Sequence, residues 1–395
     1  MKRLLVVSVG LAALTLGVVL AWYGVRQQRE FQRLITAGDT ALEHDQTYGA
    51  IEAFSGALAL KHDSMLAYLK RGDTYRRRGE LDSALRDLRQ AAALDPSAPR
   101  PVELLGDVNA AMGRYERAAE HYRAFTELDD QSPPVFYKLA LAYYRNGQTE
   151  RAIEPLRRAV ALDGRFTEAH YLLGVCLRDR GDADEARVAL TRAVEINAAF
   201  AAAREELADL YERAGQRGQA VEELEALAAL EPTRPERLVS VGLAYARWGR
   251  TDAAILTLGK AAERFPDQPA VYTALGRVWL QVAGLSTDRV ALGKALEALQ
   301  PIAVTASASG ETLMLYGRAT FLAGDLAIAE RLLQQATLRS PVEPVAYRYL
   351  ADASERLGHL ASAHEALRRY VALVGGSEVE STVTDRLERL QKRLN

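Results

Sequence analysis

Apolar residues recur along most of this chain at the spacing of an amphipathic α-helix. Between residues 81 and 94, for example, Leu85, Leu88 and the pair Ala91–Ala92 fall on one helical face, and charged residues fill the other. Glycines and prolines interrupt the pattern at regular intervals, which predicts a series of helices joined by short turns. No strand is expected, so the predicted fold class is all-α.

The helical pattern is an internal repeat. Ten frames follow one another, and only the eighth is longer than the rest, by about two helical turns. The frames are 31–64, 65–98, 99–132, 133–166, 167–200, 201–234, 235–268, 269–309, 310–343 and 344–377. Their eighth positions are all glycine or alanine: Gly38, Gly72, Gly106, Ala140, Gly174, Ala208, Gly242, Gly276, Gly317 and Ala351. A second column is always alanine: Ala50, Ala84, Ala118, Ala152, Ala186, Ala220, Ala254, Ala295, Ala329 and Ala363.

Each column has a physical explanation. A small residue at the eighth position lets a second helix approach the first, and the alanine column is expected to supply the opposing small surface. A glycine between the columns, such as Gly79 or Gly113, is expected to end the first helix in the left-handed conformation. Prolines such as Pro96 and Pro266 close the second helix. Each frame is therefore a pair of antiparallel helices, which buries its apolar face only by stacking on its neighbours.

This pattern resembles the tetratricopeptide repeat family. In frame 235–268 the signature positions of that family are occupied by Leu238, Val241–Gly242, Tyr245, Ala254, Leu258, Ala261 and Pro266. The resemblance implies a right-handed superhelical solenoid of ten helix pairs over residues 31–377. It also implies a protein that binds proteins or peptides, mostly on a concave face lined by the first helix of each pair.

The N-terminal segment, residues 1–30, differs from the repeats. Residues 4–25 carry no charge, Lys2 and Arg3 precede them, and Trp22–Tyr23 lie near their end, which predicts one transmembrane helix in the lipid bilayer. The alternative is a cleaved signal peptide with a processing site at Val19–Leu20–Ala21. The anchor reading, with a short basic start, favours a single-pass bacterial inner-membrane protein. It places the solenoid in the periplasm in preference to the cytoplasm.

Two further segments depart from the repeat. Residues 378–395 form an amphipathic pattern, with Val383, Leu387, Leu390 and Leu394 on one stripe, and are predicted to be a C-terminal capping helix. The extra residues of the eighth frame fall around 282–291, where Ser286 or Thr287 is expected to cap a longer second helix. This insertion is either a tolerated extension or a protrusion that docks a partner.

Composition and charge exclude several kinds of chemistry. There are 50 Lys and Arg residues against 52 Asp and Glu residues, so no basic field attracts nucleic acid. A lone cysteine, Cys176, excludes an intrachain disulfide and any cysteine-built metal centre. No two of the six histidines stand four residues apart, and no glycine-rich phosphate loop follows a strand. We therefore expect no metal, no cofactor and no enzymatic activity.

The positions that line the concave face in the resembled family give candidate binding residues. In frame 133–166 they are Tyr137, Leu141, Tyr144 and Arg145, and in frame 167–200 they are Tyr171, Val175 and Arg178. A weaker second patch in frame 310–343 is Met314, Arg318 and Phe321. Tyrosine rings supply contact area and arginines orient carboxylates, so these residues suit a peptide groove. The alternative is that the tyrosines pack between helices and the arginines are solvated.

The sequence thus predicts a scaffold that recruits or assembles an envelope or export complex through its concave surface. The alternative is a cytoplasm-facing regulatory adaptor of envelope biogenesis. The order of elements is partly similar to the lipopolysaccharide assembly protein B family, which has one N-terminal span followed by these repeats. That family ends in a four-cysteine metal module, and this chain has no cysteine after Cys176.

Overall fold

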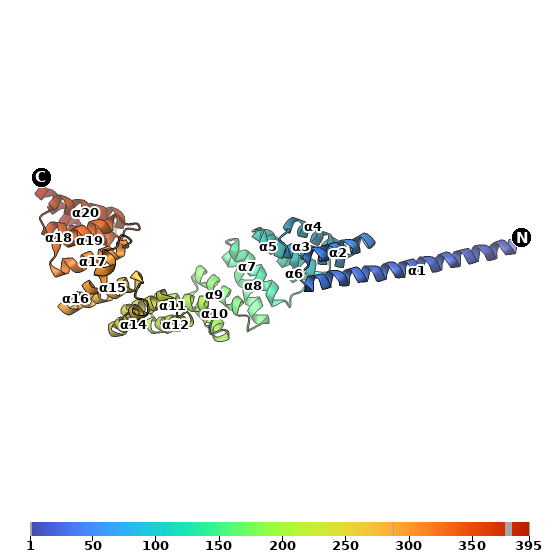
Figure 1. The fold of residues 1–395 in the computed structure, drawn as a ribbon, viewed down its shortest axis with the longest axis horizontal. Helices are drawn as coiled ribbons and strands as arrows, with labels where there is room; N and C mark the ends of the chain where they lie inside the picture. The colour runs from blue at the N-terminus through green and yellow to red at the C-terminus, as the bar shows by residue number, and fades with distance from the viewer. Residues whose placement is uncertain (1, 287, 376–380, 395) are drawn as a thin grey trace. The chain divides into compact units, whose positions relative to one another are not determined.

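The computed structural model describes residues 2–286, 288–375 and 381–394, and in these ranges it contains twenty-one α-helices and no strand (Figure 1). The all-α prediction is confirmed. The chain divides into two compact units, Met1–Ala198 and Ala199–Asn395.

The first unit holds ten helices. They are α1 (Lys2–Glu43), α2 (Thr47–Leu60), α3 (Met65–Arg77), α4 (Leu81–Leu94), α5 (Pro99–Ala111), α6 (Tyr115–Leu128), α7 (Pro133–Arg145), α8 (Thr149–Leu162), α9 (Thr167–Arg180) and α10 (Ala183–Ile196). The second unit holds the rest. They are α11 (Ala201–Arg213), α12 (Arg217–Leu230), α13 (Pro235–Arg247), α14 (Thr251–Arg264), α15 (Pro269–Ser286), α16 (Arg289–Ala303), α17 (Gly310–Ala323), α18 (Leu326–Thr337), α19 (Pro344–Arg356), α20 (Leu360–Val374) and α21 (Ser381–Leu394).

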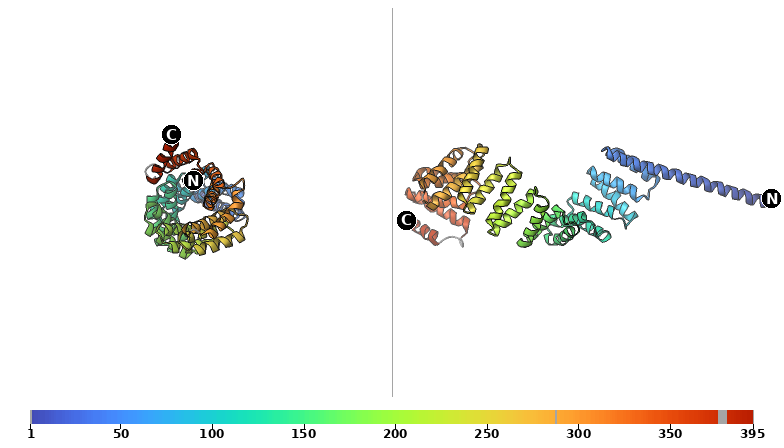
Figure 2. Two further views of the ribbon diagram at one scale, coloured as in Figure 1. Left: turned by 90° about the vertical axis from the view of Figure 1, so that its left-hand side faces the viewer. Right: turned by 90° about the horizontal axis from the view of Figure 1, so that it is seen from below.

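Within each unit the helices pack as consecutive pairs, and each pair packs on the next (Figure 2). A short turn joins the two helices of a pair, and in most pairs a glycine in the left-handed conformation lies in this turn; between α1 and α2 the residue with positive φ is Asp45, at 57°. The positive φ angles, from 71° to 98°, belong to Gly79, Gly113, Gly147, Gly181, Gly215, Gly249, Gly324 and Gly358. The expected left-handed glycine is confirmed at every one of these turns, because a residue with a side chain would be strained there.

The eighth position of each frame explains how closely the two helices of a pair approach. A Cβ atom built on Gly242 would lie 2.5 Å from Cγ of Leu258, and one built on Gly276 would lie 2.4 Å from Cγ of Leu299. Both leucines are fully buried. The nearest group opposite the glycine is therefore a large apolar side chain. The alanine column lies close as well: a Cβ on Gly174 would be 3.1 Å from the backbone oxygen of Ala186, and one on Gly317 would be 3.5 Å from that of Ala329. Hydrogen in place of a side chain leaves the room that the leucine fills.

The structure of helix α1 does not agree with the predicted membrane span. Its C-terminal part packs on α2 through Phe31 and Ile35, both buried. Among the described residues, no helix combines the length and the apolar character that crossing a bilayer requires. Arg26, Arg29 and Glu30 follow Val25 in α1, so charged residues separate its N-terminal apolar part from the apolar residues that pack on α2.

The transmembrane helix over residues 4–25 is thus an incorrect prediction. The single-pass bacterial inner-membrane location that depended on it is also wrong. The lipid bilayer as a partner, and the periplasmic side of the solenoid inferred from the same helix, lose their support.

The insertion of the eighth frame lengthens the first helix of its pair. Helix α15 has 18 residues, and Ser286 lies at its end instead of capping the next helix. The cap of α16 is Asp288, whose carboxylate accepts hydrogen bonds from the backbone of Val290 at 2.8 Å and of Ala291 at 3.3 Å. Aspartate is a strong N-cap because its oxygen satisfies backbone donors that lack helical partners. The other expected cap, Thr287, lies outside the described residues.

At the C-terminal end, α21 packs on α20. Val383 and Leu390 of the predicted stripe are buried, whereas Leu394 is exposed. Arg386 of α21 donates hydrogen bonds to Asp352 at 2.5 Å and to Glu355 at 2.7 Å, both on α19. The helix therefore covers the last repeat with its apolar stripe and bonds to it with a charged group.

We predict opposite effects of two glycine-to-alanine substitutions. Gly242→Ala should destabilise the fold by about 1–3 kcal/mol, because the added methyl group overlaps Leu258. Gly259→Ala should stabilise it by up to about 1 kcal/mol, because nothing lies within 4 Å of its new Cβ and alanine favours helix. Urea unfolding followed by circular dichroism measures both. Equal midpoints for the two variants would contradict the packing role of the eighth position.

Candidate functional site

The tyrosines predicted on α7 and α9 are partly buried. The Tyr137 ring packs on Phe166 with centroids 5.1 Å apart, and burial raises the pKa of its hydroxyl above the ordinary value. Tyr144 and Tyr171 are half-buried as well, as is Leu141. Val175 is only 5% exposed, so its side chain belongs to the core and is not available to a ligand.

The two predicted arginines of this region have intramolecular contacts. The guanidinium of Arg145 lies over the Tyr115 ring, 5.9 Å from its centroid. Arg178 forms an ion pair with Asp179, with Nη2 and Oδ1 2.7 Å apart. The surface left by α7 and α9 consists of half-exposed tyrosine edges and Leu141, with arginines that already have partners.

The second predicted patch, on α17, is also partly internal. Met314 is 5% exposed and lies in the core. Arg318 lies over the Tyr349 ring at 5.4 Å, and the Phe321 ring lies under the guanidinium of Arg356 at 4.5 Å. The structure therefore places Arg318 and Phe321 at the surface but in contact with the neighbouring helix α19.

Several charged side chains on the first helices pair with the first helix of the neighbouring repeat, and α21 pairs with α19 in the same way. These pairs are Lys70 with Asp39, Lys138 with Glu103 and Asp107, Arg237 with Glu205, Arg247 with Glu212, Arg277 with Glu311, and Arg386 with Asp352 and Glu355. We call this set the ion-pair ladder. It links neighbouring repeats within a unit, and it neutralises much of the charge on the first-helix face.

A cavity opens on a first-helix face of the second unit. Three first helices, α13, α15 and α17, surround a cavity of about 330 Å³ together with residues 302–309. We call it the first-helix pocket. Its apolar walls include Val239 and Leu243 of α13, Ala270 and Ala274 of α15, and Ile302. The Arg277–Glu311 ion pair of the ladder lies at its edge.

A chain of hydroxyl groups forms the polar side of this pocket. Thr273 and Thr312, both buried, share a hydrogen bond of 2.9 Å between their hydroxyls. Thr312 is also 2.8 Å from the hydroxyl of Ser309, which caps α17. A site with apolar walls and a few fixed polar groups suits an apolar side chain on a peptide backbone.

This pocket was not predicted from the sequence, although several of its residues stand at frame positions that indicate the same helical face as the predicted candidates. Val239, Leu243, Ala270, Thr273 and Arg277 stand at the second, fifth and ninth positions of their frames, as the candidates on α7 do in theirs. They were passed over because they include no tyrosine. Residues 302–309, which close the pocket, lie at the end of the lengthened frame and include none of the small-residue positions that mark the repeat.

Neither the cysteine nor the acidic residues form a metal centre in the described ranges. Among those residues, no three His, Cys, Asp or Glu side chains are grouped so that they could hold a metal ion. Cys176 is buried, and burial raises the pKa of its thiol to about 12. Such a thiol is a small apolar core group rather than a nucleophile.

Comparison with known proteins now identifies the class. The sequence model of the tetratricopeptide repeat matches residues 35–99, 69–133, 137–203 and 317–378, and a second model of the same repeat matches 177–240. The chain therefore belongs to the tetratricopeptide repeat family, as its sequence resemblance predicted.

Several solved structures are similar. A chain of MamA protein is 28% identical, covers 42% of this chain and 92% of its own length, and has a TM-score of 0.41. YrrB, described as a TPR protein with an unusual peptide-binding site, is 26% identical over 46% of this chain and 94% of its own, with a TM-score of 0.43. A TPR protein from Cytophaga hutchinsonii is 16% identical over 61% of this chain and 99% of its own. Its TM-score of 0.53 shows a shared fold. A search of curated proteins gave no match.

The ion-pair ladder gives a pH-dependent prediction. Burial alone would raise the pKa of Glu103, but hydrogen bonds and charges from Lys138 and Arg100 outweigh it and hold the pKa below its ordinary value. This stabilisation is present above the unfolded-state pKa and is lost as pH falls through the folded-state pKa. Lys138→Met should therefore cost about 1–2 kcal/mol near neutral pH and much less in acid. Unfolding midpoints measured across pH test this, and a loss independent of pH would contradict it.

Proposed function

We propose that this chain is a non-enzymatic scaffold that binds an extended segment of a partner protein in the first-helix pocket. Tetratricopeptide repeat proteins are in general protein-interaction scaffolds, which supports the class of function. The observation that carries the specific proposal is the cavity enclosed by α13, α15 and α17.

The shape and lining of the pocket fit one apolar side chain of a peptide. Val239, Leu243 and Ala270 offer an apolar wall, and a cavity of about 330 Å³ accommodates a leucine or a phenylalanine. The exposed hydroxyls of Ser307 and Ser309 lie at the same opening and are suited to bond the peptide backbone. The Arg277–Glu311 pair then flanks the peptide and favours polar residues beside the apolar anchor.

The surface of α7 and α9 is a second proposed contact region, on the first unit. It consists of Tyr137, Leu141, Tyr144 and Tyr171. Half-exposed tyrosines add contact area at low entropic cost, because each has only two side-chain torsions. An envelope or export complex, the partner expected from the sequence, loses its support without the membrane span, so the proposal names a peptide segment and no particular complex.

Filling the pocket tests the main proposal. Peptides selected from a random phage-displayed library on the full chain should bind Ala270→Trp at least about tenfold more weakly, because the indole occupies the apolar wall. The matched control is Leu256→Trp on α14, where the side chain is 60% exposed and away from the pocket. Fluorescence anisotropy measures affinity, and circular dichroism checks the fold. Equal binding by both variants would remove the pocket from the proposal.

The α7–α9 surface needs its own test. Among the selected peptides, those whose hydrogen-exchange footprint covers α7 and α9 should lose about tenfold in affinity for Tyr137→Ala/Tyr171→Ala. The control is Tyr137→Phe/Tyr171→Phe, which keeps the rings and the packing of Tyr137 on Phe166. Unchanged affinity in the alanine variant, with an intact fold, would show that these tyrosines serve only packing.

A further inference from the structure

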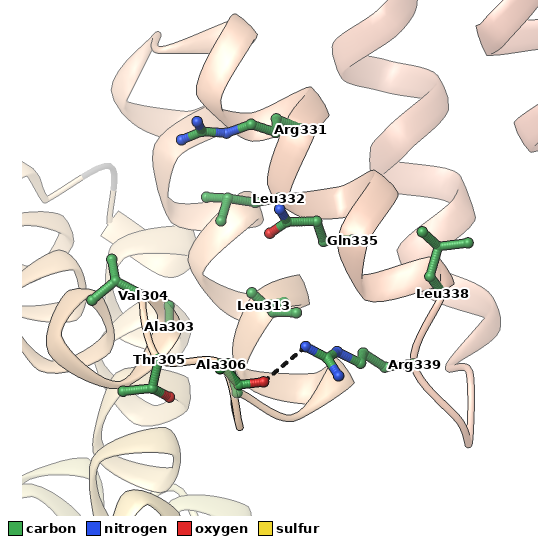
Figure 3. Close-up of a pocket in the computed structure, with 11 residues that line it drawn as sticks. Ala303, Val304, Thr305, Ala306, Leu313, Arg331, Leu332, Gln335, Leu338 and Arg339 are labelled. Carbon is green, nitrogen blue, oxygen red and sulfur yellow. Dashed lines mark hydrogen bonds between the residues drawn. The ribbon is translucent and has the colours of Figure 1, made fainter.

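A second and larger pocket lies outside the first-helix face. It is a cavity of about 560 Å³ between the C-terminal end of α16, residues 304–308, and α18 with the residues that follow it (Figure 3). We call it the lateral pocket. It shares only Thr305 and Ala308 with the first-helix pocket, so the segment 304–309 forms part of the wall of both.

Apolar side chains form part of the floor and of the rim of the lateral pocket. Leu313 and Leu332 are buried and contribute to its lining. Two lining side chains are strongly exposed: Val304 is 73% exposed and Leu338 is 84% exposed, and they lie on either side of the group in Figure 3. Apolar side chains that remain this exposed around one cavity are typical of an interaction surface.

The charged groups of this pocket are all positive. Arg331 and Arg339 line it, Gln335 lies between them, and the lining includes no carboxylate. Arg339 donates a hydrogen bond of 3.0 Å to the backbone oxygen of Ala306, drawn as a dashed line in Figure 3, which holds its guanidinium at the opening. The other donors of that guanidinium stay available. Within the described part of the chain, neither arginine forms an ion pair, in contrast to the arginines of the ion-pair ladder.

We propose that the lateral pocket binds an acidic segment of a partner protein that carries a large apolar residue. The apolar side chain would enter between Leu313 and Leu332 and cover Val304, and the flanking carboxylates would pair with Arg331 and Arg339. Guanidinium groups are suited to this because they bind carboxylates through two parallel hydrogen bonds. Charge complementarity selects this occupant over a neutral apolar segment, which would leave both cations without a partner. The inference goes beyond the proposed function, because all of these residues except Leu313 lie on second helices and the connections after them.

The test uses three labelled peptides and the full chain. The probe is Asp-Glu-Leu-Phe-Glu-Asp, and its two controls are Asn-Gln-Leu-Phe-Gln-Asn, without charge, and Asp-Glu-Ser-Ser-Glu-Asp, without an apolar anchor. The acidic apolar peptide should bind at least about tenfold more tightly than either control, and its affinity should fall as salt is added. Binding of the uncharged peptide with equal affinity would overturn the proposal, as would the absence of any binding.

Variants locate the binding. Arg331→Glu/Arg339→Glu should weaken the acidic peptide by at least about tenfold. The matched control Arg217→Glu/Arg289→Glu changes the net charge equally at two exposed arginines of the same unit that do not line the pocket, and it should bind as the parent does. Equal binding by the two double variants would overturn the proposal.

Two further measurements distinguish peptide binding in the lateral pocket from binding in the first-helix pocket and from self-association of the chain. Ala270→Trp should leave acidic-peptide binding unchanged, and its loss would place the peptide in the first-helix pocket instead. If no peptide bound in the first-helix pocket, the acidic peptide should still bind in the lateral pocket. Sedimentation of the unliganded chain is the second measurement: a dimer that Val304→Glu/Leu338→Glu dissociates would assign the surface to a second copy and overturn the proposal.

Discussion

The close approach of the two helices in each repeat is the constraint on which the rest of the structure depends. A glycine at the eighth position makes room for a large buried side chain of the second helix, as at Gly242 with Leu258. The lengthened eighth frame shows how strongly this contact is maintained. Its insertion lies between Gly276 and Leu299, and yet these two residues meet as closely as the pairs of the regular frames. The extra residues lie beyond Gly276 and extend the C-terminal end of α15 to Ser286, so they lengthen the helix without separating Gly276 from Leu299.

The elements that depend on local chemistry could be predicted from the sequence. The left-handed turn glycines follow from backbone sterics, and the first helices from α3 onward begin at the residues with which the frames begin. The partner of each small residue could not be predicted, because it depends on how two helices are rotated about their axes. The same limit explains why the burial of Val175 and Met314 was not predicted. A frame position indicates on which face of its helix a residue lies, but the neighbouring helices determine whether that face is buried. The predicted span over residues 4–25 is not supported, because none of the described helices is long and apolar enough to cross a bilayer.

The near-zero net charge has a structural counterpart in the ion-pair ladder. Pairs such as Lys70 with Asp39 link first helices one repeat apart, so the charge of one repeat is balanced by the next. Exposed pairs of this kind contribute little stability individually. Their main consequence is for recognition, because a carboxylate or guanidinium that already has a partner must lose it before a ligand gains it. An arginine without such a partner, as at Arg331, is therefore a more selective signal for an acidic ligand than the arginine content of a repeat.

Both pockets adjoin the segment 304–309, and this follows from the way a solenoid packs. In a regular repeat the apolar faces of each helix pair are covered by the neighbouring pairs, which leaves little space for a ligand. In frame 269–309 the first helix is longer and the second ends at Ala303, followed by a connection that packs beside α17 and α18. That connection cannot fill the space that a regular helix end would occupy, so a cavity remains on each side of it. The early end of α16 and the connection after it thus leave room for ligands in the second unit, and residues of the segment 304–309 line both pockets.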